Sequence, residues 1–93
     1  MIKSFRHKGL QSFFETGSRA GIRPDHAAKL RLILAALHAA ESAEDLMPPP
    51  GWRLHALQGG YAGHWSLTVS GNWRVIFQFD GHDVALVDYV DYH

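Results

Sequence analysis

The chain has 93 residues, no cysteine and a formal net charge of zero, and 46% of its residues are hydrophobic while 19% are charged. A chain of this length and composition is expected to form a single globular domain over residues 1–93, and not a disordered or fibrous protein. The lack of cysteine excludes a disulfide scaffold, thiol catalysis and cysteine-ligated zinc. The amino terminus lacks an apolar signal segment and the longest apolar run, residues 32–37, is too short to cross a bilayer, so a cytoplasmic location is expected.

The charge is distributed unevenly along the chain. Residues 1–40 carry seven basic and two acidic side chains, whereas residues 41–93 carry two basic and seven acidic ones. This asymmetry fits a positively charged face that could meet phosphate groups or an acidic partner. A solvated basic helix surface explains the same pattern, so charge alone does not decide between the two.

The first half of the chain predicts two helices after a short strand. Residues 2–6 alternate in polarity and are a candidate first strand. Apolar residues at helical spacing predict a helix over residues 9–16, which ends where Gly17 can form the C-cap. A second helix is expected to begin near Pro24. Its buried stripe consists of Leu30, Ile33, Leu34 and Leu37.

The pattern changes after the second helix. Ser42 is expected to cap one extra turn over residues 43–46. Residues 47–51, Met-Pro-Pro-Pro-Gly, predict a stiff extended connector, because proline disfavours both a helix and a central strand. Beyond the connector, alternating polarity and turn residues predict strands. They cover residues 53–57, 64–70, 72–80 and 83–90, with tight turns at 70–71 and 80–81.

These elements predict an α+β fold of order β-α-α-β-β-β, with two N-terminal helices packed on one face of a mainly antiparallel sheet. The strand over residues 72–80 places Trp73, Val75 and Phe77 toward the helices and Arg74 on the opposite face, which is left for function. An arginine in so apolar a strand is costly unless it meets an anion, and its planar fork of donors suits phosphate. A salt bridge to an acidic residue near the C-terminus would also satisfy it.

The chain contains seven histidines, and most are interpreted without a chemical role. His7, His26, His38 and His82 are expected at the surface, and His64 in a supporting or solvated position on the polar face of its strand. The last six residues, Asp-Tyr-Val-Asp-Tyr-His, could be an acid/base tail or only a polar strand end. No hydrolase, nucleotide-binding or zinc-protease motif is present, and no metal or cofactor is expected.

Four segments of the second half carry a family pattern. They are Leu54-His55-Ala56-Leu57, Gly63-His64-Trp65-Ser66, Asn72-Trp73-Arg74-Val75-Ile76-Phe77 and Asp88-Tyr89-Val90-Asp91-Tyr92-His93. Together with the opening segments Met1-Ile2-Lys3-Ser4-Phe5, Lys8-Gly9-Leu10 and Phe14-Glu15-Thr16-Gly17, they resemble the HigB branch of the RelE/ParE superfamily of type II toxins. The resemblance covers nearly the whole chain, and the family's order of elements matches the predicted one.

The resemblance implies a toxin that enters the ribosomal A site and cuts mRNA during translation. In such toxins the RNA 2′-hydroxyl attacks the neighbouring phosphate without a metal and leaves a 2′,3′-cyclic phosphate. By position, the resemblance implies catalytic roles for His55, Arg74, Asp91, Tyr92 and His93. Arg74 would hold the phosphate, His55, Asp91 and His93 would share proton transfer, and Tyr92 would contact a base. The implied RNA-binding residues are Asn72, Gln58 and Lys8.

One position departs from the pattern of the HigB branch. The branch often has a lysine in a Leu-His-x-Leu-Lys segment, whereas this chain has Gln58. Without that cation, the transition state has less charge stabilisation. Two alternatives therefore stay open: a ParE-like inhibitor of DNA gyrase, and a catalytically weakened module that only binds its antitoxin. His55 and the terminal Asp-Tyr-His favour the nuclease, because a gyrase inhibitor does not need acid/base groups.

The expected partners follow from the same resemblance. They are a HigA-like antitoxin with a helix-turn-helix domain, the ribosome and its mRNA. Operator DNA would be reached only through the antitoxin, and no membrane partner is expected.

Overall fold

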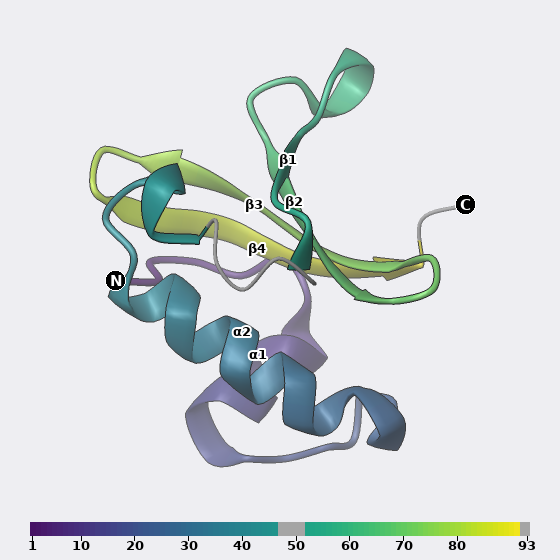
Figure 1. Ribbon diagram of the computed structural model, residues 1–93. Coiled ribbons are helices and arrows are strands. Elements are labelled where there is room, and N and C mark those ends of the chain that lie inside the picture. The colour runs from purple at the N-terminus through teal and green to yellow at the C-terminus, as the bar shows by residue number, and fades with distance from the viewer. Residues whose placement is uncertain (47–51, 92–93) are drawn as a thin grey trace.

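The computed structural model describes residues 1–46 and 52–91, so the predicted connector at 47–51 and the predicted site residues Tyr92 and His93 lie outside the described residues. Two α-helices precede a four-stranded sheet of order β1-β2-β3-β4, in which every neighbouring pair is antiparallel. Both helices lie on one side of the sheet, as Figure 1 shows. The predicted α+β fold is therefore confirmed. We call the sheet face turned away from the helices the open face.

Helix α1 spans Lys8–Thr16 and begins one residue earlier than predicted. His7 accounts for the difference, because its Nδ1 accepts a hydrogen bond from Leu10 N–H at 2.9 Å and so caps the helix. At the other end, Gly17 has a φ of 80° and donates its N–H to the Phe13 carbonyl oxygen. The predicted glycine C-cap is confirmed, whereas His7 is half-buried and structural instead of a surface residue.

Helix α2 spans Ala27–Ala39 and follows the short 3-10 turn η1, Pro24–His26. Its predicted apolar stripe is confirmed, since each of the four residues is at most 1% exposed. The predicted extra turn is the 3-10 turn η2, Ala43–Leu46, which is closed by a hydrogen bond from Asp45 N–H to the Ser42 carbonyl oxygen at 3.1 Å. Neither α-helix is long and apolar enough to cross a membrane.

The bounds of the last three strands agree with the predicted bounds within one residue, whereas those of β1 do not. Strand β1 spans His55–Ala56, β2 spans Trp65–Ser70, β3 spans Trp73–Asp80 and β4 spans Asp83–Asp91. Strand β1 has two residues instead of the predicted five. The reason lies partly at Arg53, whose φ of 51° is a left-handed conformation that does not continue a strand.

The core lies between the helices and the sheet, and its β3 members alternate as predicted. Val75 and Phe77 are fully buried there. Three residues of the open face, His64, Ser66 and Ile76, are buried as well, although none of them belongs to this core. The open face is therefore partly buried, although both helices lie on the other side of the sheet (Figure 1).

The first residues run parallel to β4 without forming a continuous strand. The pairing consists of two isolated bridges, Ile2 with Val84 and Phe5 with Val87. Between them Leu86 has a φ of 57°, and its N–H donates to the Ser4 hydroxyl at 2.9 Å. This left-handed residue interrupts the ladder, so the predicted strand over residues 2–6 is reduced to two bridges.

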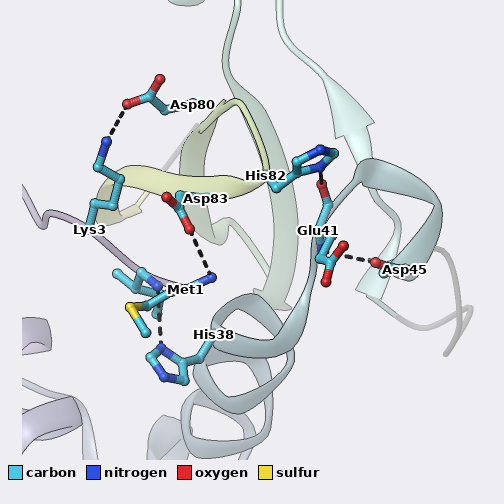
Figure 2. Close-up of polar contacts among 9 residues, drawn as sticks. Met1, Lys3, His38, Glu41, Asp45, Asp80, His82 and Asp83 are labelled. Carbon is cyan, nitrogen blue, oxygen red and sulfur yellow. Dashed lines mark hydrogen bonds and ion pairs between the residues drawn. The ribbon is translucent and has the colours of Figure 1, made fainter.

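Polar contacts fasten this N-terminal segment to the β3–β4 turn and to the end of α2 (Figure 2). The terminal ammonium lies 3.5 Å from Asp83, and Lys3 Nζ donates to Asp80 at 2.8 Å. The hydrogen bond from Lys3 lowers the pKa of the Asp80 carboxyl, but both groups are exposed and such pairs add little stability. His38 Nδ1 accepts from Ile2 N–H at 3.3 Å. His38 and His82 are exposed, as predicted.

The start of α1 crosses the following loop at a pair of glycines. A Cβ on Gly21 would lie 2.8 Å from Gly9 Cα, and neither backbone can move aside as a flexible side chain would. We expect Gly21→Ala to lower the free energy of unfolding by about 1–3 kcal/mol, measured by urea denaturation. Gly60→Ala is the control, because nothing lies within 4 Å of its added Cβ. Equal stability of the two variants would contradict the close crossing.

Candidate functional site

A cavity of about 580 Å³ lies on the open face of the sheet. Its walls come from β1, the segment after it, β2 and β3. The lining residues are His55, Leu57, Gln58, Ser66, Arg74 and Ile76. A second cavity of about 250 Å³ shares His55, Ser66 and Arg74 with the first. The structure therefore brings together three of the predicted site residues, His55, Gln58 and Arg74.

The register of the sheet explains why these residues meet. Ser66 is paired with His55 on one side and with Ile76 on the other. Residues directly opposite each other in antiparallel strands project to the same face, so the three side chains form a row across β1, β2 and β3. Arg74 lies two residues from Ile76 on β3 and thus on the same face.

Arg74 is held by the backbone and not by an acidic side chain. Its Nη1 donates to the carbonyl oxygens of Gly71 at 2.5 Å and Trp73 at 3.1 Å. No ion pair of Arg74 with Asp88, Asp91 or any other residue occurs within 1–46 and 52–91. Within these ranges its other N–H groups donate no hydrogen bond, and guanidinium N–H groups of this kind suit an anion.

Two of the predicted RNA-binding residues lie away from the cavity. Asn72 is exposed in the β2–β3 turn, and Lys8 is exposed at the first position of α1, on the helix side of the sheet. Neither lines the two cavities. Among the residues that the structure describes, no three histidine or acidic side chains are grouped to bind a metal ion.

The end of β4 places Asp91 on the face opposite Arg74. Asp91 is paired with Trp73, whose ring packs against Tyr89 and His26 on the helix side. A bulge between Ile76 and Gln78 decides this arrangement, because it shifts the β3–β4 register by one residue. If the pairing near the β3–β4 turn continued unshifted, Asp91 would share the face of Arg74.

Two histidines are buried that the sequence placed at or near the surface. His26 is 4% exposed, and its Nδ1 lies 2.5 Å from the Tyr89 hydroxyl. The surface prediction for His26 was wrong because the η1 turn directs the ring inward before α2 begins. His64 is 7% exposed, lies edge-on to Tyr61, and its Nδ1 is 3.4 Å from the Gln78 amide nitrogen. The solvated position is therefore wrong for His64, and its supporting role stays a prediction.

The buried phenol of Tyr89 makes stability depend on alkaline pH. Burial raises the pKa of Tyr89 above its usual value of about 10. A group whose pKa is higher in the folded than in the unfolded protein stabilises the fold fully at pH values below its unfolded-state pKa. This stabilisation is lost as pH rises through the folded-state pKa. We therefore expect the free energy of unfolding to fall above about pH 10, and to fall less steeply in Tyr89→Phe. Urea denaturation of both proteins from about pH 8 to pH 11 measures this. An equal fall of the free energy of unfolding with pH in the wild type and in Tyr89→Phe would contradict it.

Comparison with known proteins assigns the family. A family model described as the RelE-like toxin of the type II toxin-antitoxin system HigB matches residues 3–93. The chain belongs to this HigB family of toxins. The Endoribonuclease HigB of Proteus vulgaris is 40% identical over 93 residues and covers both chains completely. The Toxin HigB-1 of Vibrio cholerae is 38% identical over 95 residues, which cover all of this chain and 98% of that protein.

Membership of the HigB family confirms the resemblance that the sequence motifs carried. As a type II toxin, the chain has an antitoxin as its partner. The family assignment gives no geometry, whereas the structure places two motif residues, His55 and Arg74, in one cavity. The roles of the individual site residues stay predictions.

Proposed function

We propose that this HigB-family toxin is a ribosome-dependent endoribonuclease that cuts mRNA in the ribosomal A site and so stops translation. The observation that carries the proposal is the cavity in which His55 and Arg74 converge on the open face. The name of the Proteus relative, Endoribonuclease HigB, supports the same class of reaction. Action on ribosomes places the protein in the cytoplasm.

The proposed reaction is an internal transfer that needs no metal or other cofactor. The RNA 2′-oxygen forms a bond to phosphorus while the bond from phosphorus to the 5′-oxygen breaks, which leaves a 2′,3′-cyclic phosphate. One group takes the 2′ proton, and another gives a proton to the departing 5′-oxygen. Arg74 binds the phosphate through two N–H groups and stabilises the negative charge that develops on it. His55, on the neighbouring wall, is one of the two proton-transfer groups.

The remaining predicted residues lie partly in the cavity and partly outside it. We assign the second proton transfer to His93 and contact with a base to Tyr92, and both lie beyond the described residues. Gln58 lines the cavity and donates hydrogen bonds through its amide where the family often has a lysine. Asn72 in the β2–β3 turn and Lys8 on the helix side contact RNA away from the cavity.

The antitoxin is proposed to be HigA-like and to carry a helix-turn-helix domain. Operator DNA is then bound through the antitoxin and not by this chain. A small helix-turn-helix protein encoded beside the toxin is the expected partner.

Induction of the chain alone tests the proposal. Growth and protein synthesis should stop while DNA supercoiling stays normal, and the adjacent antitoxin should restore growth. On ribosomes programmed with a defined mRNA, the purified chain should produce fragments that end in a 2′,3′-cyclic phosphate. Gyrase-dependent DNA breaks with intact mRNA would instead indicate a ParE-like inhibitor. Antitoxin binding without an effect on mRNA or DNA would indicate a module that only binds.

A further inference from the structure

The second cavity on the open face carries a positive charge that the proposed reaction does not use. Besides the three residues that it shares with the first cavity, it is lined by Arg53, Leu54 and Thr68. Among the described residues that line the two cavities, none is acidic, and Arg53 and Arg74 are the permanently charged ones. The second cavity therefore presents two guanidinium groups without a compensating carboxylate.

The register of the sheet explains why Arg53 shares a cavity with Arg74. Thr68 is paired with Arg74, and Ser66, two residues earlier on β2, is paired with His55. Arg53 comes two residues before His55, so antiparallel pairing carries the chain from His55 toward Thr68. The left-handed backbone of Arg53 ends β1, but the residue still lines the cavity.

The side chain of Arg53 is available to a ligand. Arg53 is exposed and forms no ion pair or hydrogen bond through its guanidinium to any residue within 1–46 and 52–91. Two like charges that line one cavity repel each other, and an anion between them turns this repulsion into attraction. The φ of 51° at Arg53 is rare for a residue other than glycine, and such strained backbone is concentrated at ligand-binding sites.

We propose that Arg53, Thr68 and Arg74 form a second phosphate subsite, which binds the RNA backbone phosphate next to the scissile one. Arg74 lines both cavities and so lies between the two phosphates. Guanidinium and hydroxyl donors suit phosphate oxygens, and such contacts fix the register of a strand without reading its sequence. Arg53 is thus a binding residue that does not touch the reacting bond. This inference rests on the proposed endoribonuclease function.

A three-nucleotide RNA with 2′-O-methyl groups tests the subsite, because it cannot be cleaved and contains two phosphodiester linkages. Arg53→Asn should weaken its binding to the purified chain about 5- to 20-fold, measured by NMR titration. A neutral methylphosphonate at one linkage should abolish this effect of Arg53→Asn, whereas the same change at the other linkage should leave it. The variant should also lower the slope of log affinity against log salt by about 0.7, the value for one phosphate contact on a single strand.

The control variants separate binding from folding. Asparagine tolerates left-handed backbone and glycine adopts it without strain, so Arg53→Asn and Arg53→Gly should both keep Tm within about 3 °C of the wild type. Arg53→Lys keeps the charge but loses the planar fork and should bind with intermediate affinity. Arg19→Asn removes an exposed arginine that lines neither cavity, and it should bind as the wild type does.

Two binding outcomes would overturn the proposal. One is unchanged affinity in Arg53→Asn. The other is equal weakening whichever linkage is neutral, because Arg53 would then act only through general charge attraction.

Kinetics on programmed ribosomes complete the test and separate the subsite from the proposed function. Arg53→Asn should raise KM and leave kcat unchanged, as expected for a contact made equally in the ground and transition states. A fall in kcat at constant KM would overturn the subsite. A wild-type chain that does not cleave mRNA contradicts the proposed function, while the uncleavable RNA still measures the subsite.

Discussion

Arg74→Ala is expected to slow mRNA cleavage about 100- to 1,000-fold and to remove toxicity, because the developing charge on the phosphate loses its charged donors. The fold should survive, since Arg74 pairs with no acidic side chain of the described residues and its two hydrogen bonds go to neighbouring carbonyl oxygens. Cleavage on programmed ribosomes and thermal unfolding measure the two effects, and we expect Tm to shift by no more than about 3 °C.

Two further variants test whether the effect of Arg74→Ala comes from the loss of the guanidinium group at this position. Arg74→Lys keeps a charge but loses the planar fork, so its rate should lie between those of the wild type and the alanine variant. Arg6→Ala removes an exposed arginine outside the cavity and should leave the rate unchanged. Unfolding of Arg74→Ala under conditions where the wild type is folded would indicate a structural role instead.

His55→Ala is expected to slow cleavage about 100- to 10,000-fold, because a positioned proton-transfer group contributes a factor of that size. The wild-type rate should change between about pH 5 and pH 8, the range in which imidazole groups titrate, and the variant should lose part of that dependence. Single-turnover cleavage across this range measures both. His82→Ala, at an exposed position in the β3–β4 turn, is the matched control.

A comparison with His93→Ala shows whether both histidines transfer protons or only His93 does. If both histidines transfer protons, each alanine variant should lose a different limb of the pH–rate profile. A profile that is unchanged in His55→Ala and lost in His93→Ala would mean that His55 only binds RNA.

The elements with strong local signals were predictable from the sequence. The buried stripe of α2 follows from apolar residues at helical spacing, and the alternation along β3 follows from apolar residues at every second position. Gly17 supplies the left-handed residue that ends α1. The surface prediction for His26 failed because burial depends on tertiary packing, which puts the ring against Tyr89, a residue 63 positions away. The shortness of β1 depends on the left-handed backbone at Arg53. Arginine rarely adopts this conformation, so its presence in the sequence gives no sign of it.

The candidate site was predictable to the extent that it depends on alternation and motifs. Arg74, His55 and Gln58 meet in the cavity because regular pairing of β1, β2 and β3 brings them together. The face of Asp91 was not predictable, because it depends on one extra residue in β4, where two residues lie opposite the single β3 residue between Ile76 and Gln78. Side chains alternate with a period of two, so a single extra residue reverses the face of everything after it.

The parallel pairing of the N-terminal segment with β4 also constrains the order in which the molecule can be assembled during its own synthesis. Ile2 and Phe5 are made well before their partners Val84 and Val87, because almost all of the described chain lies between them. Contacts of such long sequence separation form late, since a long loop must close before they are gained. We therefore expect a nascent chain to lack this edge until β4 has emerged from the ribosome. The helices and the β2–β3 hairpin, which depend on nearer contacts, can form before it.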